Sequence, residues 1–157
     1  MTSIRPATLD HDGIEALVPH RGAMCLLERM VAWDDTRIEC VATGHRDPDH
    51  PLRTRSGLMA SVAIEYAAQA AALHGGLVAQ ASGTTALPGY LASAREVHLA
   101  AWRLDDLPRA AVDELRIVAE RQAGDATHLL YAFNVAHDGR EIAAGRLAVI
   151  LNAQDRS

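Results

Sequence analysis

Glu65 stands alone in an apolar stretch of the chain. Between Gly57 and Leu73 the sequence reads GLMASVAIEYAAQAAAL, and Glu65 is its only ionisable carboxylate. A helix that is apolar on nearly every face is a buried helix. Burying a carboxylate there is costly unless the group has partners or faces water and ligand. Because burial also favours the protonated carboxyl, we expect Glu65 to act as a general acid.

Two further polar residues lie on the same side of this helix. Ser61, Glu65 and Gln69 follow one another at intervals of four residues and therefore share one face. One interpretation is a catalytic carboxylate that lines a pocket and is oriented by Ser61 or Gln69. The other is a polar seam that faces a second subunit or buried water. The pattern alone leaves both interpretations open.

Histidines are the candidate bases. Of the eight histidines in the chain, four precede the helix, and His20, His45 and His50 are the ones considered as bases. Pro19 fixes the backbone beside His20 and so holds its ring in a reproducible direction. The sequence has no HxxxH pair and no His/Cys cluster, so we expect no metal site.

The elements that position these residues follow from hydrophobic periodicity. The apolar stretch predicts a long helix from Leu58 to about Gln80, with Gly75-Gly76 as its weak point. Asp138-Gly139 predicts a hairpin between the last two strands. One long helix followed by an antiparallel meander predicts an α+β fold, in which a sheet wraps the helix. The other expected elements are a short helix over residues 12–17 and strands over residues 37–43, 90–99, 112–122, 127–137 and 141–151.

Composition narrows the class of protein. The 157 residues are 49% apolar and 22% charged, which predicts one globular domain over residues 1–157. The formal charge of −5, without a dense basic tract, argues against a nucleic-acid partner. We expect no membrane span and a cytoplasmic protein, because residues 57–73 are too short and alanine-rich to cross a bilayer and no secretion signal opens the chain. Cys25 and Cys40 are then expected to be buried thiols, with a catalytic Cys25 as the weaker alternative.

Two segments resemble motifs of the β-hydroxyacyl–acyl carrier protein dehydratases. Leu17–Arg29 reads LVPHRGAMCLLER and resembles the opening PHR-x-P motif of that family, which continues with two hydrophobic residues, an acidic residue and arginine. Ile64–Ala70 reads IEYAAQA and resembles its helix motif, in which glutamine follows a carboxylate by four residues. The spelling is most similar to the divergent branch found in aryl-polyene and xanthomonadin-type pigment clusters. The resemblance covers most of the chain.

This resemblance implies a hotdog fold, a long central helix wrapped by a curved antiparallel sheet, in a homodimer or dimer of dimers. In such dehydratases a histidine before the helix acts as the base and the helix carboxylate of the neighbouring subunit, here Glu65, acts as the acid. The usual Gly-His-Phe-Pro loop is replaced by Asp49-His50-Pro51-Leu52, and the usual Pro-Gly at the helix start by Ser56-Gly57. His50 and His20 are therefore equal candidates for the base.

The resemblance also implies a substrate and its contacts. The expected reaction converts a 3-hydroxyacyl thioester on acyl carrier protein to the trans-2-enoyl thioester, without a metal or organic cofactor. Backbone N–H groups at the helix start, including that of Gly57, would stabilise the enolate oxygen. Arg53 and Arg55, which lie with Arg46 in the loop before the helix, would bind the phosphopantetheine phosphate or the acidic carrier protein. The alternative for these arginines is a solvated loop.

Two other functions fit the same fold. In an acyl thioesterase, Glu65 would activate water instead of donating a proton. A non-catalytic subunit would pair with an active dehydratase as a heterodimer and shape the acyl chain. The fold does not distinguish these functions from dehydration.

Overall fold

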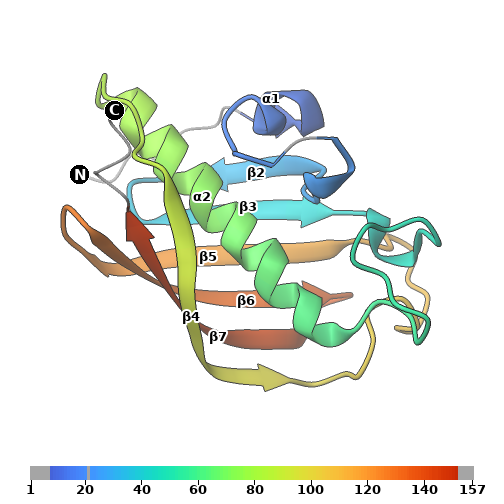
Figure 1. Cartoon of the computed structure of the whole chain (residues 1–157). Helices are drawn as coiled ribbons and strands as arrows, with labels where there is room; N and C mark the ends of the chain where they lie inside the picture. Colours follow the sequence, from blue (N-terminus) through green and yellow to red (C-terminus); the bar gives the residue numbers. More distant parts are fainter. Residues whose placement is uncertain (1–7, 21, 152–157) are drawn as a thin grey trace.

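A long helix lies across the concave face of a single antiparallel sheet in the computed structural model of the chain (Figure 1). The structure describes residues 8–20 and 22–151, so Arg21 of the PHR segment lies outside the described residues. The elements are β1 (Leu9–Asp10), α1 (His11–Glu15), η1 (Gly22–Met24), β2 (Arg29–Trp33), β3 (Arg37–Ala42), η2 (Gly44–Arg46), η3 (Ala60–Val62), α2 (Ala63–Ala81), β4 (Gly89–Leu99), β5 (Leu115–Gly124), β6 (His128–His137) and β7 (Arg140–Leu151).

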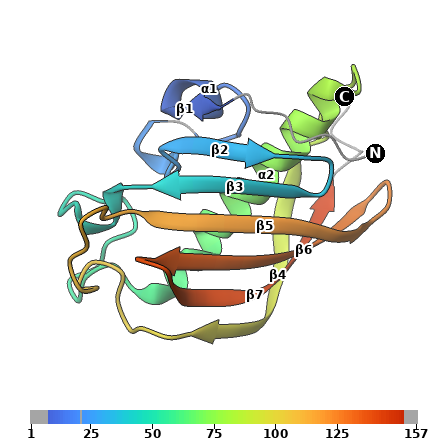
Figure 2. The ribbon, with the colours of Figure 1, turned by 180° about the vertical axis from the view of Figure 1, so that it is seen from behind.

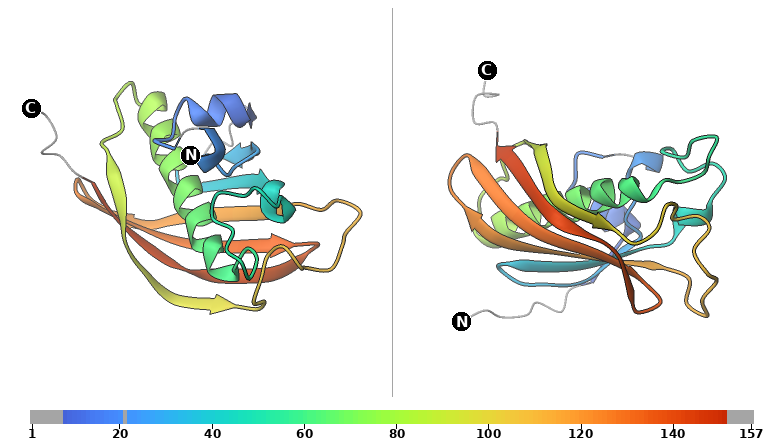
Figure 3. Two further views of the ribbon diagram at one scale, coloured as in Figure 1. Left: turned by 45° about the vertical axis from the view of Figure 1, so that its right-hand side comes forward. Right: turned by 90° about the horizontal axis from the view of Figure 1, so that it is seen from below.

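The sheet has seven strands in the order β1-β2-β3-β5-β6-β7-β4, and every neighbouring pair is antiparallel (Figure 2). The β6–β7 hairpin turns at Asp138 and Gly139, both with positive φ, as the Asp-Gly prediction requires. β4 follows the helix in sequence and pairs with β7, which places this strand at one edge of the sheet. The sheet curves around the helix (Figure 3). The α+β prediction of a central helix wrapped by a curved antiparallel sheet is confirmed.

α2 is buried over most of its surface, as its composition predicts. Its apolar residues pack against the concave face of the sheet, mainly against β3, β5 and β6. His74 anchors the middle of the helix to the sheet and to the turn after β2. Its Nδ1 accepts a hydrogen bond from Tyr131 Oη at 2.8 Å, and its Nε2 donates to Asp34 O at 2.9 Å. The helix continues through Gly75-Gly76, and a Cβ at Gly76 would lie in tight contact with the Leu17 carbonyl oxygen, at 3.3 Å.

The start of the helix differs from the sequence prediction. Helical turns begin at Ala60 instead of Leu58. Leu58 lies outside the helical turns because its carbonyl, which a helix would need, accepts from Leu104 N at 2.8 Å. Its N–H donates to Asp105 Oδ1 at 3.0 Å, and Met59 forms a β-bridge with Arg103. None of the helices in the described residues has the length and hydropathy needed to cross a bilayer.

Candidate active site

Glu65 and Gln69 meet on α2, as their spacing predicts. Gln69 Nε2 donates to Glu65 Oε1 at 3.2 Å, while Ser61 is exposed near the start of the helix. The Glu65 side chain is 32% exposed, so the prediction of a buried carboxylate is wrong for the single chain. The reason is geometric: the sheet covers the opposite side of α2, and Ser61, Glu65 and the small residues beyond them lie on the uncovered side.

Gln69 fastens the segment after His20 to the helix. Its buried amide donates from Nε2 to Met24 O and accepts at Oε1 from Leu26 N, both at 2.8 Å. One side chain therefore holds two backbone groups of this segment and also contacts the Glu65 carboxylate. The interpretation of Gln69 as the residue that orients Glu65 agrees with this geometry.

Replacing Gln69 by Leu is expected to lower the free energy of unfolding by about 1–3 kcal/mol, because the Leu26 N–H and the Met24 carbonyl lose their partner. Turnover should fall as well, since the segment that follows His20 is no longer held. Urea denaturation and a rate measurement check both effects. Gln80→Leu, on the exposed last turn of the same helix, is the control and should stay within about 0.5 kcal/mol of the parent. Equal effects of the two substitutions would contradict the anchoring role.

His20 contacts the helix carboxylate directly. Its Nε2 lies 3.1 Å from Glu65 Oε1, and the two side chains are 28% and 32% exposed. Nδ1 of His20 is buried and has no hydrogen-bond partner among the described residues. With Nε2–H pointing at the carboxylate, the free lone pair of the neutral ring lies on Nδ1. His20 and Glu65 thus form an imidazole–carboxylate pair within one chain.

His50 is held in a different way. Its Nδ1 accepts a hydrogen bond from Leu52 N at 3.1 Å, so the proton of the neutral ring lies on Nε2, which donates to Tyr66 Oη at 3.0 Å. Burial lowers the pKa of His50, which keeps the ring neutral. Both ring nitrogens are thereby occupied, and the structure brings His20, not His50, to Glu65. Tyr66 is a site residue that the sequence analysis did not single out; its position next to Glu65 was the available signal.

A cavity of about 180 Å³ opens beside His50. It lies between the start of α1, the segment after His20, the loop after β3 and Tyr66 of the helix. Glu65 and His20 are not among its lining residues, so in the single chain their pair lies outside it. The lining residues are His11, Ala23, Cys25, Leu26, Glu28, Thr43, Gly44, Asp47, Asp49, His50, Pro51 and Tyr66.

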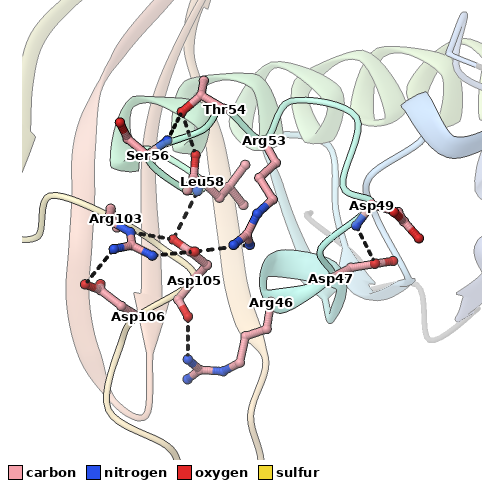
Figure 4. A network of polar contacts seen from close by, with 11 residues as sticks. Arg46, Asp47, Asp49, Arg53, Thr54, Ser56, Leu58, Arg103, Asp105 and Asp106 are labelled. Carbon is pink, nitrogen blue, oxygen red and sulfur yellow. Dashed lines mark hydrogen bonds and ion pairs between the residues drawn. The ribbon is translucent and has the colours of Figure 1, made fainter.

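Asp105 organises the loop before the helix (Figure 4). Its side chain, only 4% exposed, accepts hydrogen bonds from Leu58 N and from Arg103, and pairs with Arg53 Nη1 at 3.1 Å. The Arg103 hydrogen bonds, aided by the Leu58 N–H, hold the pKa of Asp105 well below its usual range. Arg53 therefore has an internal partner, whereas Arg55 is exposed. Phosphate binding by these two arginines stays a prediction.

Gly57 has a structural role in the same loop. Its φ of +109° is a glycine conformation, and a Cβ there would lie 2.5 Å from Arg103 Nε. Its N–H donates to Thr54 O at 3.0 Å. A contact between this N–H and an enolate oxygen, as the sequence analysis expects, would have to replace that bond, and it stays a prediction.

Both cysteines are buried free thiols in the structure, in line with the sequence expectation. Burial raises the pKa of Cys40 to about 12, which keeps that thiol protonated and unreactive. Cys25 lines the cavity beside His50. A catalytic role for Cys25 stays a prediction.

A long helix wrapped by a curved antiparallel sheet, with a histidine–carboxylate pair on the uncovered side of that helix, defines a hotdog-fold protein. The ApeP-like family model, described as ApeP dehydratase, matches residues 13–156. The chain belongs to this family of hotdog dehydratases.

Solved structures show the same fold. The ApeI:P dehydratase heterocomplex of Xenorhabdus doucetiae matches with a TM-score of 0.78 and 22% identity, over 90% of this chain and 91% of that chain. A thioesterase of Haemophilus influenzae matches with a TM-score of 0.62 and 13% identity, over 94% of this chain and 93% of that one. No curated protein matches the chain in sequence.

Proposed function

We propose that the protein is a hydro-lyase that removes water from a 3-hydroxyacyl thioester on acyl carrier protein and forms the trans-2-enoyl thioester. The contact between His20 Nε2 and Glu65 Oε1 carries this proposal, because dehydration needs a base and an acid held side by side. Membership of a dehydratase family supports the reaction type. The similarity of the two sequence motifs to the pigment-cluster branch favours a cytoplasmic polyene-type pathway.

The pair divides the two proton transfers between its two side chains. Neutral His20 takes the proton α to the thioester carbonyl, and its contact with Glu65 holds the base next to the acid. The protonated Glu65 donates from Oε2 to the β-hydroxyl, which leaves as water as the Cα–Cβ double bond forms. One proton is taken and one is given, so the charge of the site is restored when the imidazolium returns its proton to the carboxylate.

The two histidine candidates are separated by matched substitutions. His20→Asn removes the base and is expected to lower the dehydration rate by about 100-fold. His50→Asn is expected to cost less than about 10-fold, because an asparagine oxygen can still accept from Leu52 N. The assay follows enoyl product from a 3-hydroxyacyl carrier-protein thioester. The reverse order of rates would make His50 the base and sink the assignment of His20.

Thioester hydrolysis is the second candidate function. Its support is the Glu65 carboxylate, which could activate water, together with the fold that the chain shares with thioesterases. The same assay distinguishes the two reactions: dehydration gives an enoyl thioester without free thiol, whereas hydrolysis releases the carrier thiol. Release of thiol at the rate of substrate loss would replace our proposal with this one.

We further propose that the active form is a dimer, most simply a heterodimer with a second dehydratase-type subunit. β4 is an 11-residue edge strand that is exposed over most of its length, including Tyr90, Leu91 and Leu99. A long exposed edge of this kind is a surface for strand pairing. The related ApeI:P structure is a dehydratase heterocomplex. Co-expression with each dehydratase gene of the same cluster tests this assembly; activity only in the copurified complex would indicate a partner subunit, active or non-catalytic.

A further inference from the structure

A second polar cluster lies where β3 and β6 end and β5 begins. It brings together His45 of η2, Asp113 of the loop before β5 and His137 at the end of β6. One possible ligand atom from each residue lies within 4.8 Å of the others. Asp113 Oδ1 is 2.7 Å from His137 Nε2 and 3.6 Å from His45 Nε2. None of these residues takes part in the His20–Glu65 pair.

His45 is the unusual member of the cluster. It is 0% exposed, and neither ring nitrogen has a hydrogen-bond partner among the described residues. A buried polar ring without a partner is rare in folded proteins and calls for a missing water, ion or ligand. The structure thus contains a buried imidazole with no hydrogen-bond partner among the described residues, next to a carboxylate and a second imidazole.

From this geometry we propose that His45, Asp113 and His137 bind a divalent transition-metal ion of the Zn²⁺ type. Two imidazoles and one carboxylate are the ligands that such ions prefer. Ligands about 2.0–2.1 Å from a tetrahedral Zn²⁺ lie about 3.3 Å apart. The His45–Asp113 separation of 3.6 Å is close to this value, whereas His137 must exchange its short hydrogen bond for coordination.

Arg46 completes the surroundings of this site. Its guanidinium donates two hydrogen bonds to the Asp113 carboxylate, from Nη2 to Oδ1 at 2.9 Å and from Nε to Oδ2. Ligating carboxylates are commonly hydrogen-bonded by such an outer group, which fixes their orientation. Arg46 can keep its bond to Oδ2 while Oδ1 turns to the ion. A bound ion would then join η2, which begins the loop that carries His50, to the ends of two strands.

The test is zinc binding to the full chain after removal of metals with a chelator. Wild type is expected to bind one Zn²⁺ per chain at this site, and its melting temperature should rise by about 5–10 °C at a large excess of zinc over Kd. His45→Leu removes one ligand without breaking a hydrogen bond of that ring, and His137→Gln removes a second. Both should lose the zinc-dependent rise. His128→Gln, at an exposed histidine, should keep it.

Cobalt and magnesium make the outcome specific. Co²⁺ should give the visible absorption of a tetrahedral site in wild type and in His128→Gln only, and Mg²⁺ should leave the melting temperature unchanged. No rise with zinc in wild type would overturn the proposal. An equal rise in His45→Leu and His137→Gln would also overturn it, because zinc would then bind elsewhere. If one of these variants does not fold, the other decides.

Discussion

Glu65→Gln is expected to lower the dehydration rate about 1000-fold while the fold persists. The amide has the shape of the carboxyl group but can neither donate the acidic proton nor accept the His20 Nε2–H as a carboxylate does. Gln69 Nε2 can still donate to the new amide oxygen, so the packing of the helix is unchanged. The measurement is single-turnover formation of enoyl product, with circular dichroism and urea denaturation as the check on folding.

The control for this substitution is Glu141→Gln, at an exposed position of β7. It makes the same chemical change far from the helix and should leave the rate within a factor of two. An unchanged rate in Glu65→Gln would remove Glu65 from the mechanism. A loss of both rate and stability would instead show that Glu65 is needed for folding, and rescue of turnover by Glu65→Asp would then separate the two roles.

Asp105→Asn is expected to lower the free energy of unfolding by about 2–4 kcal/mol. Its buried carboxylate is shared by Arg53, Arg103 and the Leu58 N–H, and loss of its charge removes the anion nearest to both guanidinium groups. Asp106→Asn is a matched control one residue away. That side chain is 59% exposed and lies 3.8 Å from Arg103, so its loss should cost less than about 0.5 kcal/mol.

The same carboxylate makes a pH-dependent contribution. Arg103 and the Leu58 N–H lower the pKa of Asp105 in the folded chain below its value in the unfolded chain. The stabilisation is therefore complete above the unfolded pKa of about 3.9 and is lost as the pH falls through the lower, folded pKa. Urea denaturation should show a large difference between wild type and Asp105→Asn at pH 7 and a shrinking difference below pH 4. A difference that is independent of pH would contradict the role of the charge.

Local patterns predicted most of the fold. The hairpin at Asp138-Gly139, the strands of the second half and the long helix all depend on residues within a few positions of one another. β2 was missed because Arg29–Trp33 alternates weakly and follows an apolar run, so its pairing with β3 is decided by tertiary contact. The helix start was misplaced because Leu104, far along the chain, donates to the Leu58 carbonyl that a helix would have used.

The candidate site was predictable only in part for the same reason. The spacing of Glu65 and Gln69 is local and placed both on one helix face. The choice between His20 and His50 depends on which ring reaches the carboxylate and on which nitrogen keeps its proton. The His50 ring is held by contacts with Leu52 N and Tyr66 Oη, and residue spacing in the sequence does not predict these contacts.

The exposure of Glu65 was also beyond the sequence. Ala-rich helices are buried on average, but a curved sheet covers a helix from one side only. The pattern could not indicate which stripe of α2 would be left for solvent or for a second chain.

Arg46 joins two loops that are far apart in sequence. It donates to the Asp105 carbonyl and to the Asp113 carboxylate, while Asp105 in turn holds Arg53 and the Leu58 N–H. The segment before α2 and the segment before β5 are therefore cross-linked at several points. Such segments open together as one cooperative unit instead of fraying separately. We therefore expect access to the start of the helix to require both segments to open together, at a free-energy cost set by the whole charge network and not by any one loop.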